Sequence, residues 1–320
     1  ARALKLAGDP SHLAAQFLDS LAAAPALDDV AVLTQRFAGH SPPPPPSFFG
    51  AVATHLEASL RCSRGEDLSL SGVSIVVLAD AFASVRYSAG NTALSLACLG
   101  VPPTTTFASQ ELLRFTRAAV ELGAQGDPGI RGFLLMRFQG TAPRMEACDL
   151  AESASILARA GVFSPELSDS IELMLRGNPW AFALRDLQNL LPHFSTWRLG
   201  VVQKKAFQSL GLRFADHAES LNPEDALRVV DAFAAVGSVH EVLLQHLYLR
   251  LLLDSSFAAL PPAGIARLAA SMSSVQHYHT GLLREIVAHL RAEPEVVASW
   301  GPEHLSGTLR SLGLAPVRVP

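Results

Sequence analysis

Apolar residues recur at helical spacing along most of the chain, in short stretches that end at glycine. The clearest stretch begins at Pro223, followed by Glu224 and Asp225, which suit the positive end of a helix. Gly237 closes it, and its apolar positions share one helical face: Ala226, Val229, Val230, Phe233 and Val236. A second stripe follows at Val239, Leu243, Leu247 and Leu251. The pattern predicts two consecutive helices.

This pair of helices is repeated. The hexapeptide DAFASV that begins at Asp80 returns as DAFAAV at Asp231, an interval of about four times 38 residues. We expect the first helix of each unit to end near Gly39, Arg86, Gly123, Gly161, Phe194, Gly237, Gln276 and Gly313. Neither helix of a pair buries its apolar face alone, so stacking must supply the core. The sequence predicts an all-α fold, an α-solenoid of about eight antiparallel helix pairs with a period of about 38–39 residues.

We expect residues 1–320 to form a single α-helical repeat domain, with a degenerate unit over residues 1–70 and clearer repeats over 71–313. Pro42–Pro46 interrupt the first unit and predict an extended linker, with a ligand for a proline-reading domain as the alternative. The register also predicts that three equivalent side chains are buried between the helices of their own units, those of Phe82, Phe233 and Met272.

Composition narrows the function. Hydrophobic residues make up 49% of the chain but aromatic residues only 7%, which suits closely packed Ala- and Leu-rich helices. The net charge of −4 excludes an overall basic polyanion binder, so any nucleic-acid contact must be a local patch. The three cysteines form no CxxC pair, which predicts neither a zinc ribbon nor a disulfide framework. The long uncharged stretch from Tyr87 to Gln110 is broken by glycine and proline, so we predict no membrane span.

No pattern of catalytic residues stands out. His240-Glu241 is followed by His246 rather than by a histidine at the zincin spacing, and His277 and His279 suit a solvated turn better than a shared metal. The chain contains no phosphate-binding glycine loop with lysine and no Gly-x-Ser-x-Gly elbow. We predict no enzyme, no cofactor, no metal site and no small-molecule substrate. A hydrolase or nuclease would need a further domain that carries the active site.

Arginines recur at the unit spacing. When the first helices are aligned on their ends, three of them have an arginine at the equivalent position. These arginines are Arg114, Arg228 and Arg267. Such a ladder could follow a phosphate backbone with bidentate donors. The alternative is that these arginines only solubilise the helix face, with Asp225 and Asp231 neutralising them.

Two acid-free stretches add local positive charge. One contains Arg198, Lys204, Lys205 and Arg213, interleaved with Trp197, Phe207 and Phe214. Aromatic rings can stack on bases while cations hold phosphates, although Phe207 also lies at core spacing. The other stretch contains Arg131, Arg137 and Arg144. Both are candidate RNA-binding patches, and a bland basic surface is the alternative.

The first helices with the pattern P-E-x-A/L and DAFAxVG, followed by leucine-striped second helices, resemble heptatricopeptide and octotricopeptide repeats. They are also similar to the helical arrays of FAST-kinase-like, RAP-associated organellar proteins. The resemblance covers nearly the whole chain, most plainly residues 145–313. It implies a mitochondrial location, with the plastid as the alternative, and work on organellar RNA. The chain begins at Ala1 and ends at Pro320, so a targeting segment or a RAP tail would lie outside it.

The sequence therefore favours a non-catalytic organellar helical-repeat protein in an RNA-containing assembly. The expected setting is the mitochondrial ribosome or an RNA maturation and stability complex, with ribosomal RNA and ribonucleoprotein proteins as partners. The alternative is a protein-only scaffold of the armadillo or HEAT type. The mild acidity and the Ala- and Leu-rich surfaces favour that alternative.

Overall fold

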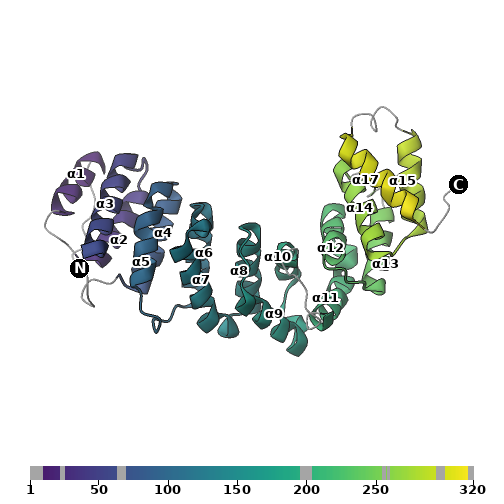
Figure 1. Cartoon of the computed structure of the whole chain (residues 1–320), viewed down its shortest axis with the longest axis horizontal. Coiled ribbons are helices and arrows are strands. Elements are labelled where there is room, and N and C mark those ends of the chain that lie inside the picture. The colour runs from purple at the N-terminus through teal and green to yellow at the C-terminus, as the bar shows by residue number, and fades with distance from the viewer. Residues whose placement is uncertain are drawn as a thin grey trace. The chain divides into compact units, whose positions relative to one another are not determined.

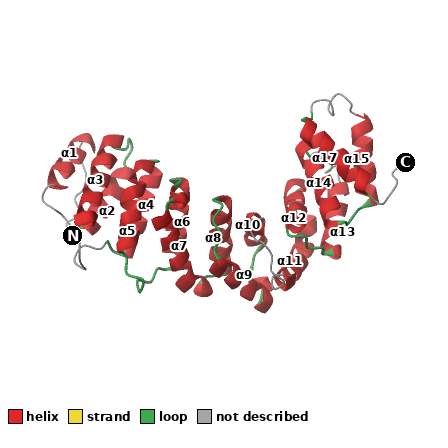
Figure 2. Ribbon diagram, viewed as in Figure 1, coloured by secondary structure: helices red, strands yellow, loops and turns green. Residues whose placement is uncertain are grey.

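The structure is a computed structural model that describes residues 10–21, 26–62, 70–194, 204–253, 257, 260–292 and 300–315. These residues form sixteen α-helices joined by short turns, and no strand occurs among them. Figure 1 shows the helices in chain order, and Figure 2 shows that every regular element of the described chain is a helix. The chain divides into two compact units, residues 1–167 and residues 168–320. The expected single domain stays a prediction.

In the first unit, helices pack against the next helix but one. One layer contains α2 (Leu27–Ala38), α4 (Gly72–Ser84), α6 (Ser109–Glu121) and α8 (Ala147–Arg159). The other contains α1 (Pro10–Leu21), α3 (Pro46–Cys62), α5 (Asn91–Gly100) and α7 (Pro128–Thr141). Helix α9 (Pro165–Gly177) spans the boundary between the units.

The second unit is built in the same way. Its first-helix layer contains α10 (Leu184–Phe194), α12 (Pro223–Ala235), α14 (Pro262–Val275) and α17 (Pro302–Leu314). Its second-helix layer contains α11 (Lys204–His217), α13 (Glu241–Leu252) and α15 (Thr280–Ala292). This neighbour-to-neighbour packing is that of an α-solenoid, so the expected fold class is confirmed.

The ends of the first helices lie close to the expected positions. They fall at Ala38, Ser84, Glu121, Arg159, Phe194, Ala235, Val275 and Leu314. The intervals between them are unequal, so a single period of about 38–39 residues is not confirmed. The expected linker also needs a correction, because Pro46 is the first residue of α3 and not part of an extended segment. Proline suits that position, where its missing N–H would have no helical partner.

Local signals explain where the helices stop and start. Gly123, Gly161 and Gly237 follow the first helices α6, α8 and α12 with φ of 67°, 70° and 62°, the left-handed conformation that glycine adopts without strain. The Asp127 carboxylate accepts hydrogen bonds from the backbone N–H groups of Gly129 and Ile130 at 2.9 and 3.1 Å and so caps α7. At these four places, one or two residues specify where a helix ends or begins.

The core confirms the burial expected of the three equivalent side chains. The side chains of Phe82, Phe233 and Met272 are all 0% exposed. The rings of Phe233 in α12 and Phe207 in α11 meet edge to face, with centroids 5.6 Å apart. Phe233 thus contacts the second helix of the preceding pair, whereas the sequence predicted a place between the helices of its own pair.

Candidate functional site

We call Arg114, Arg228 and Arg267 the ladder arginines. They lie on the first-helix layer, and each is paired with a carboxylate. Arg114 of α6 binds Asp80 of α4. In the second unit, Arg267 of α14 lies 3.5 Å from Asp231 of α12, and Arg228 lies 2.8 Å from Glu224 within its own helix. Asp80 and Asp231 are the first residues of the repeated hexapeptide. In both copies of the hexapeptide, the first aspartate therefore forms an ion pair with the arginine of the next helix pair.

Other polar side chains also join neighbouring first helices. The Gln110 amide donates to Asp149 of α8 at 2.6 Å, and the Ser271 hydroxyl donates to Asp231 at 2.8 Å. Burial raises the pKa of both carboxyl groups, and these hydrogen bonds partly offset that shift. Ion pairs and hydrogen bonds between polar side chains therefore join neighbouring first helices.

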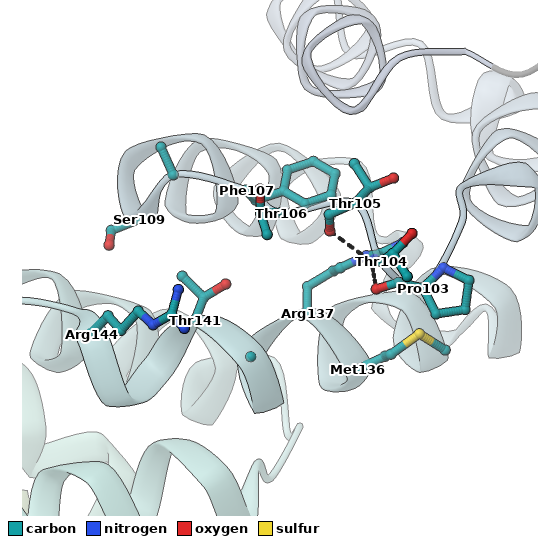
Figure 3. Close-up of a pocket in the computed structure, with 12 residues that line it drawn as sticks. Pro103, Thr104, Thr105, Thr106, Phe107, Ser109, Met136, Arg137, Thr141 and Arg144 are labelled. Atoms are coloured by element: carbon teal, nitrogen blue, oxygen red, sulfur yellow. Dashed lines mark hydrogen bonds between the residues drawn. The ribbon is translucent and has the colours of Figure 1, made fainter.

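Arg137 has a different role, because it is buried in the second-helix layer. Its side chain is 4% exposed, and its guanidinium donates to the carbonyl oxygens of Val101, Pro102, Pro103 and Thr105 at 2.8–3.2 Å. Figure 3 shows the bonds to Pro103 and Thr105. It also lies 5.0 Å from the ring centroid of Phe133. Burial lowers the pKa of this guanidinium. Arg137 therefore fastens the loop that leads into α6.

Two arginines of the second unit also donate hydrogen bonds to carbonyl oxygens of a loop. Arg213 of α11 donates to the Phe182 carbonyl at 3.3 Å and lies 4.0 Å from the Trp180 ring centroid. Arg250 of α13 donates to the Leu221 carbonyl at 3.0 Å. Counted from the helix start, both occupy the position that Arg137 has in α7. We call Arg137, Arg213 and Arg250 the loop arginines. Each fastens the loop that precedes the first helix of its own pair.

The structure therefore separates the expected RNA-binding residues into groups. Arg137 and Arg213 are buried and bonded within the fold, so they are not available to a phosphate backbone. Lys204 and Lys205 begin α11, but their side chains lie outside the described residues, as does all of Arg198. Only Arg131 and Arg144 are exposed and free of any ion pair among the described contacts.

The residue before each loop arginine is apolar and exposed, although apolar side chains usually lie in the core and arginine in water. Met136 is 49% exposed beside the buried Arg137, and Leu212 and Leu249 are 59% and 43% exposed beside Arg213 and Arg250. Leu99 of α5 and Leu173 of α9 occupy the same position and are 70% and 71% exposed. We call these five residues the outward aliphatic positions. Sequence reasoning missed them. The recurring triplets Met136-Arg137-Phe138 and Leu212-Arg213-Phe214 were the available signal.

A hollow of about 220 Å³ lies in the first unit between the 103–109 segment and the end of α7. Hydroxyl groups and arginine line much of it, from Thr104, Thr105, Thr106, Ser109, Thr141 and Arg144. Figure 3 shows Ser109, Thr141 and Arg144 around the same side of this hollow, with Arg137 on the other. The hydroxyls both donate and accept hydrogen bonds, and the Arg144 guanidinium only donates them.

The histidines of the second unit serve the helices. His240 and His279 accept the N–H groups of Leu243 and Leu282 at 3.2 and 3.3 Å through Nδ1, which caps α13 and α15. Burial and the neighbouring His277 lower the pKa of His279. Within the described ranges, no group of three or more His, Cys, Asp or Glu side chains could hold a metal ion.

His193 and Ser168 form a buried pair in the second unit, with Nε2 and Oγ 2.9 Å apart. They are 1% and 2% exposed, and burial lowers the pKa of His193 to about 4. A substrate has no access to such a pair, so it belongs to the packing between α9 and α10. Among the described helices, none is long and apolar enough to cross a membrane.

Comparison with known proteins adds no family. The chain matches no protein-family model and no curated protein. The account of function therefore depends on the residues themselves.

Proposed function

We propose that this chain is a non-catalytic helical-repeat scaffold that holds a partner protein along its stacked helices. The observation that carries the proposal is the pairing of Arg114, Arg228 and Arg267 with carboxylates. An arginine bound to a carboxylate would have to give up that partner before it could neutralise a phosphate. Together with the burial of Arg137 and Arg213, this favours the protein-only scaffold over direct RNA binding.

The exposed apolar residues support the same conclusion. Interfaces between proteins bury aliphatic side chains in their centre, whereas nucleic-acid backbones are contacted mainly by charged and polar groups. The outward aliphatic positions place such side chains on five second helices. A scaffold for protein is therefore the function that the exposed surface supports best.

The experiment is a purification of the tagged full chain from its source cells, with and without nuclease treatment. A protein scaffold should retain the same partner proteins at unchanged amounts after nuclease treatment. Loss of all partners on nuclease treatment would overturn the proposal. It would show that RNA alone holds the assembly together.

A second candidate is the organellar RNA-containing assembly, a mitochondrial ribosome or an RNA maturation complex, in which the chain would contact RNA directly. Lys204 and Lys205 favour it, because no acidic residue follows them before Asp216 in α11. The two candidates are compatible at different surfaces. They differ in whether removal of Lys204 and Lys205 weakens RNA binding: it should do so only if the chain contacts RNA directly.

A further inference from the structure

The second-helix layer of the first unit presents an apolar and basic surface on α5 and α7. We call it the α5–α7 face, and it comprises Leu99 of α5, Arg131 and Met136 of α7, and Arg144 of the turn that follows α7. We propose that this face binds an acidic amphipathic helix of a partner protein. The proposal rests on the scaffold function above and specifies which surface and which kind of segment are involved.

The apolar part of the face comes from two packed helices. Leu99 of α5 and Met136 of α7 are 70% and 49% exposed, and α5 packs against α7. Single exposed aliphatic residues are common, but these two share one position in consecutive second helices. Burial of such a position in the core would add stability. Its exposure is explained if another molecule covers it.

The charge of the face determines the partner. Helices α5 and α7 contain no aspartate or glutamate, and Arg131 and Arg144 are both exposed. The nearest acidic residues along the chain are Asp127 and Glu146. Asp127 accepts hydrogen bonds from Ser95 and the start of α7, and among the described contacts neither carboxylate pairs with these arginines. The Glu111 carboxylate lies beside the hollow and accepts the backbone N–H of Ala108 at 2.9 Å. Among the described contacts, Arg131 and Arg144 form no ion pair, and their positive charge is complementary to an acidic segment.

The hollow beside Met136 fits this partner. Its volume of about 220 Å³ compares with about 30 Å³ for one water molecule in the liquid, so a carboxylate side chain has room to enter. There it would meet the Arg144 guanidinium and the hydroxyls of Ser109 and Thr141. A carboxylate accepts hydrogen bonds from all three groups.

Spacing favours a helix as the occupant. Packed helices lie about 8–10 Å apart, and seven residues of α-helix advance by about 10.5 Å. A helix laid across the face can therefore place one apolar residue against each of α5 and α7, with acidic residues between them. RNA is the less suitable occupant because Leu99 and Met136 offer a phosphate backbone no hydrogen bond.

Site-specific photocrosslinking of the full chain tests the proposal. A benzoylphenylalanine replaces Leu99 or Met136 in cells that make the protein, and the control position is Val73, which is 56% exposed on α4 of the other layer. After irradiation and nuclease treatment, mass spectrometry identifies the crosslinked segments. We expect positions 99 and 136 to crosslink to an acidic amphipathic protein segment. Crosslinks to RNA, to a segment without acidic residues, or at the level of position 73 would overturn the proposal.

Charge reversal gives the second readout. The double variant Arg131→Glu with Arg144→Glu should lower the crosslinking yield at position 99 about tenfold, because two attractive pairs become repulsive. The matched control is Arg36→Glu with Arg159→Glu, which changes the charge equally at the ends of α2 and α8. Equal yields from the two variants would contradict the inference. If partners survive nuclease treatment and the Arg131/Arg144 variant retains them all, only this inference fails. If no partner survives, the scaffold function fails.

Discussion

At the scale of single residues, the buried arginines have the clearest energetic consequence. Arg137 takes the place of water as the hydrogen-bond donor to four backbone carbonyl oxygens in the segment from Val101 to Thr105. A buried carbonyl without a donor loses the free energy of a hydrogen bond that water supplies in the unfolded chain. The charge of Arg137 is therefore used to hold the fold together and not to bind a ligand.

Replacement of Arg137 by methionine should lower the free energy of unfolding by about 2–4 kcal/mol, because several carbonyl groups lose their donor in a buried place. The exposed neighbour is the control, and Met136→Ala should change stability by less than about 0.5 kcal/mol. Chemical denaturation of both variants measures the difference. Similar losses for the two would show that the arginine does not fasten the loop.

The buried His193 predicts a pH dependence of stability. Burial lowers its pKa to about 4 in the folded chain, whereas the unfolded chain binds the proton near its ordinary pKa of about 6.5. Between these values the unfolded state holds more protons, so stability falls as the pH falls. The loss should reach about 3 kcal/mol below pH 4.

His193→Gln keeps a polar group at the Nε2 position and removes the titration. Denaturation from pH 7 to pH 4 should show a smaller loss for this variant than for the natural chain. Parallel curves would exclude His193 as the source.

At the scale of elements, helix boundaries were easier to predict than the direction in which a side chain points. Glycine and proline fix boundaries through the local backbone, so Gly123 and Gly237 identified helix ends directly. Arg137 and Arg213 were expected to contact RNA because each lies in an acid-free basic stretch of the sequence. Their burial depends on loop carbonyls that tertiary packing brings close. A sequence pattern that considers one helix at a time does not contain that information.

The links between neighbouring first helices lead to another prediction. A double-mutant cycle with Asp231→Asn and Arg267→Gln should give a coupling energy of about 0.3–1 kcal/mol, because the pair is half-exposed. Asparagine at position 231 can still accept the hydrogen bond from the Ser271 hydroxyl, so the cycle measures only the loss of the carboxylate charge. The coupling should fall in 1 M salt, where the screening length is about 3 Å. A coupling that is zero at low salt would mean that the repeated aspartate does not join the units through its charge.

At the scale of the whole molecule, six arginines of the described chain are used for contacts within the protein. The ladder arginines are paired across or within first helices, and the loop arginines are bonded or buried. The fold class followed from the repeated pattern. The candidate site did not, because the α5–α7 face combines residues from different helices.

The most direct measurement is the affinity of the full chain for single-stranded RNA of unrelated sequences as a function of salt. A protein scaffold should bind weakly, with a slope of log affinity against log salt near zero, and Lys204→Ala with Lys205→Ala should change neither quantity. Direct RNA binding predicts tight binding, a slope of about −0.7 per phosphate contact on a single strand, and a shallower slope in the double variant. That second result would contradict the account, and the RNA-containing assembly would become the favoured function.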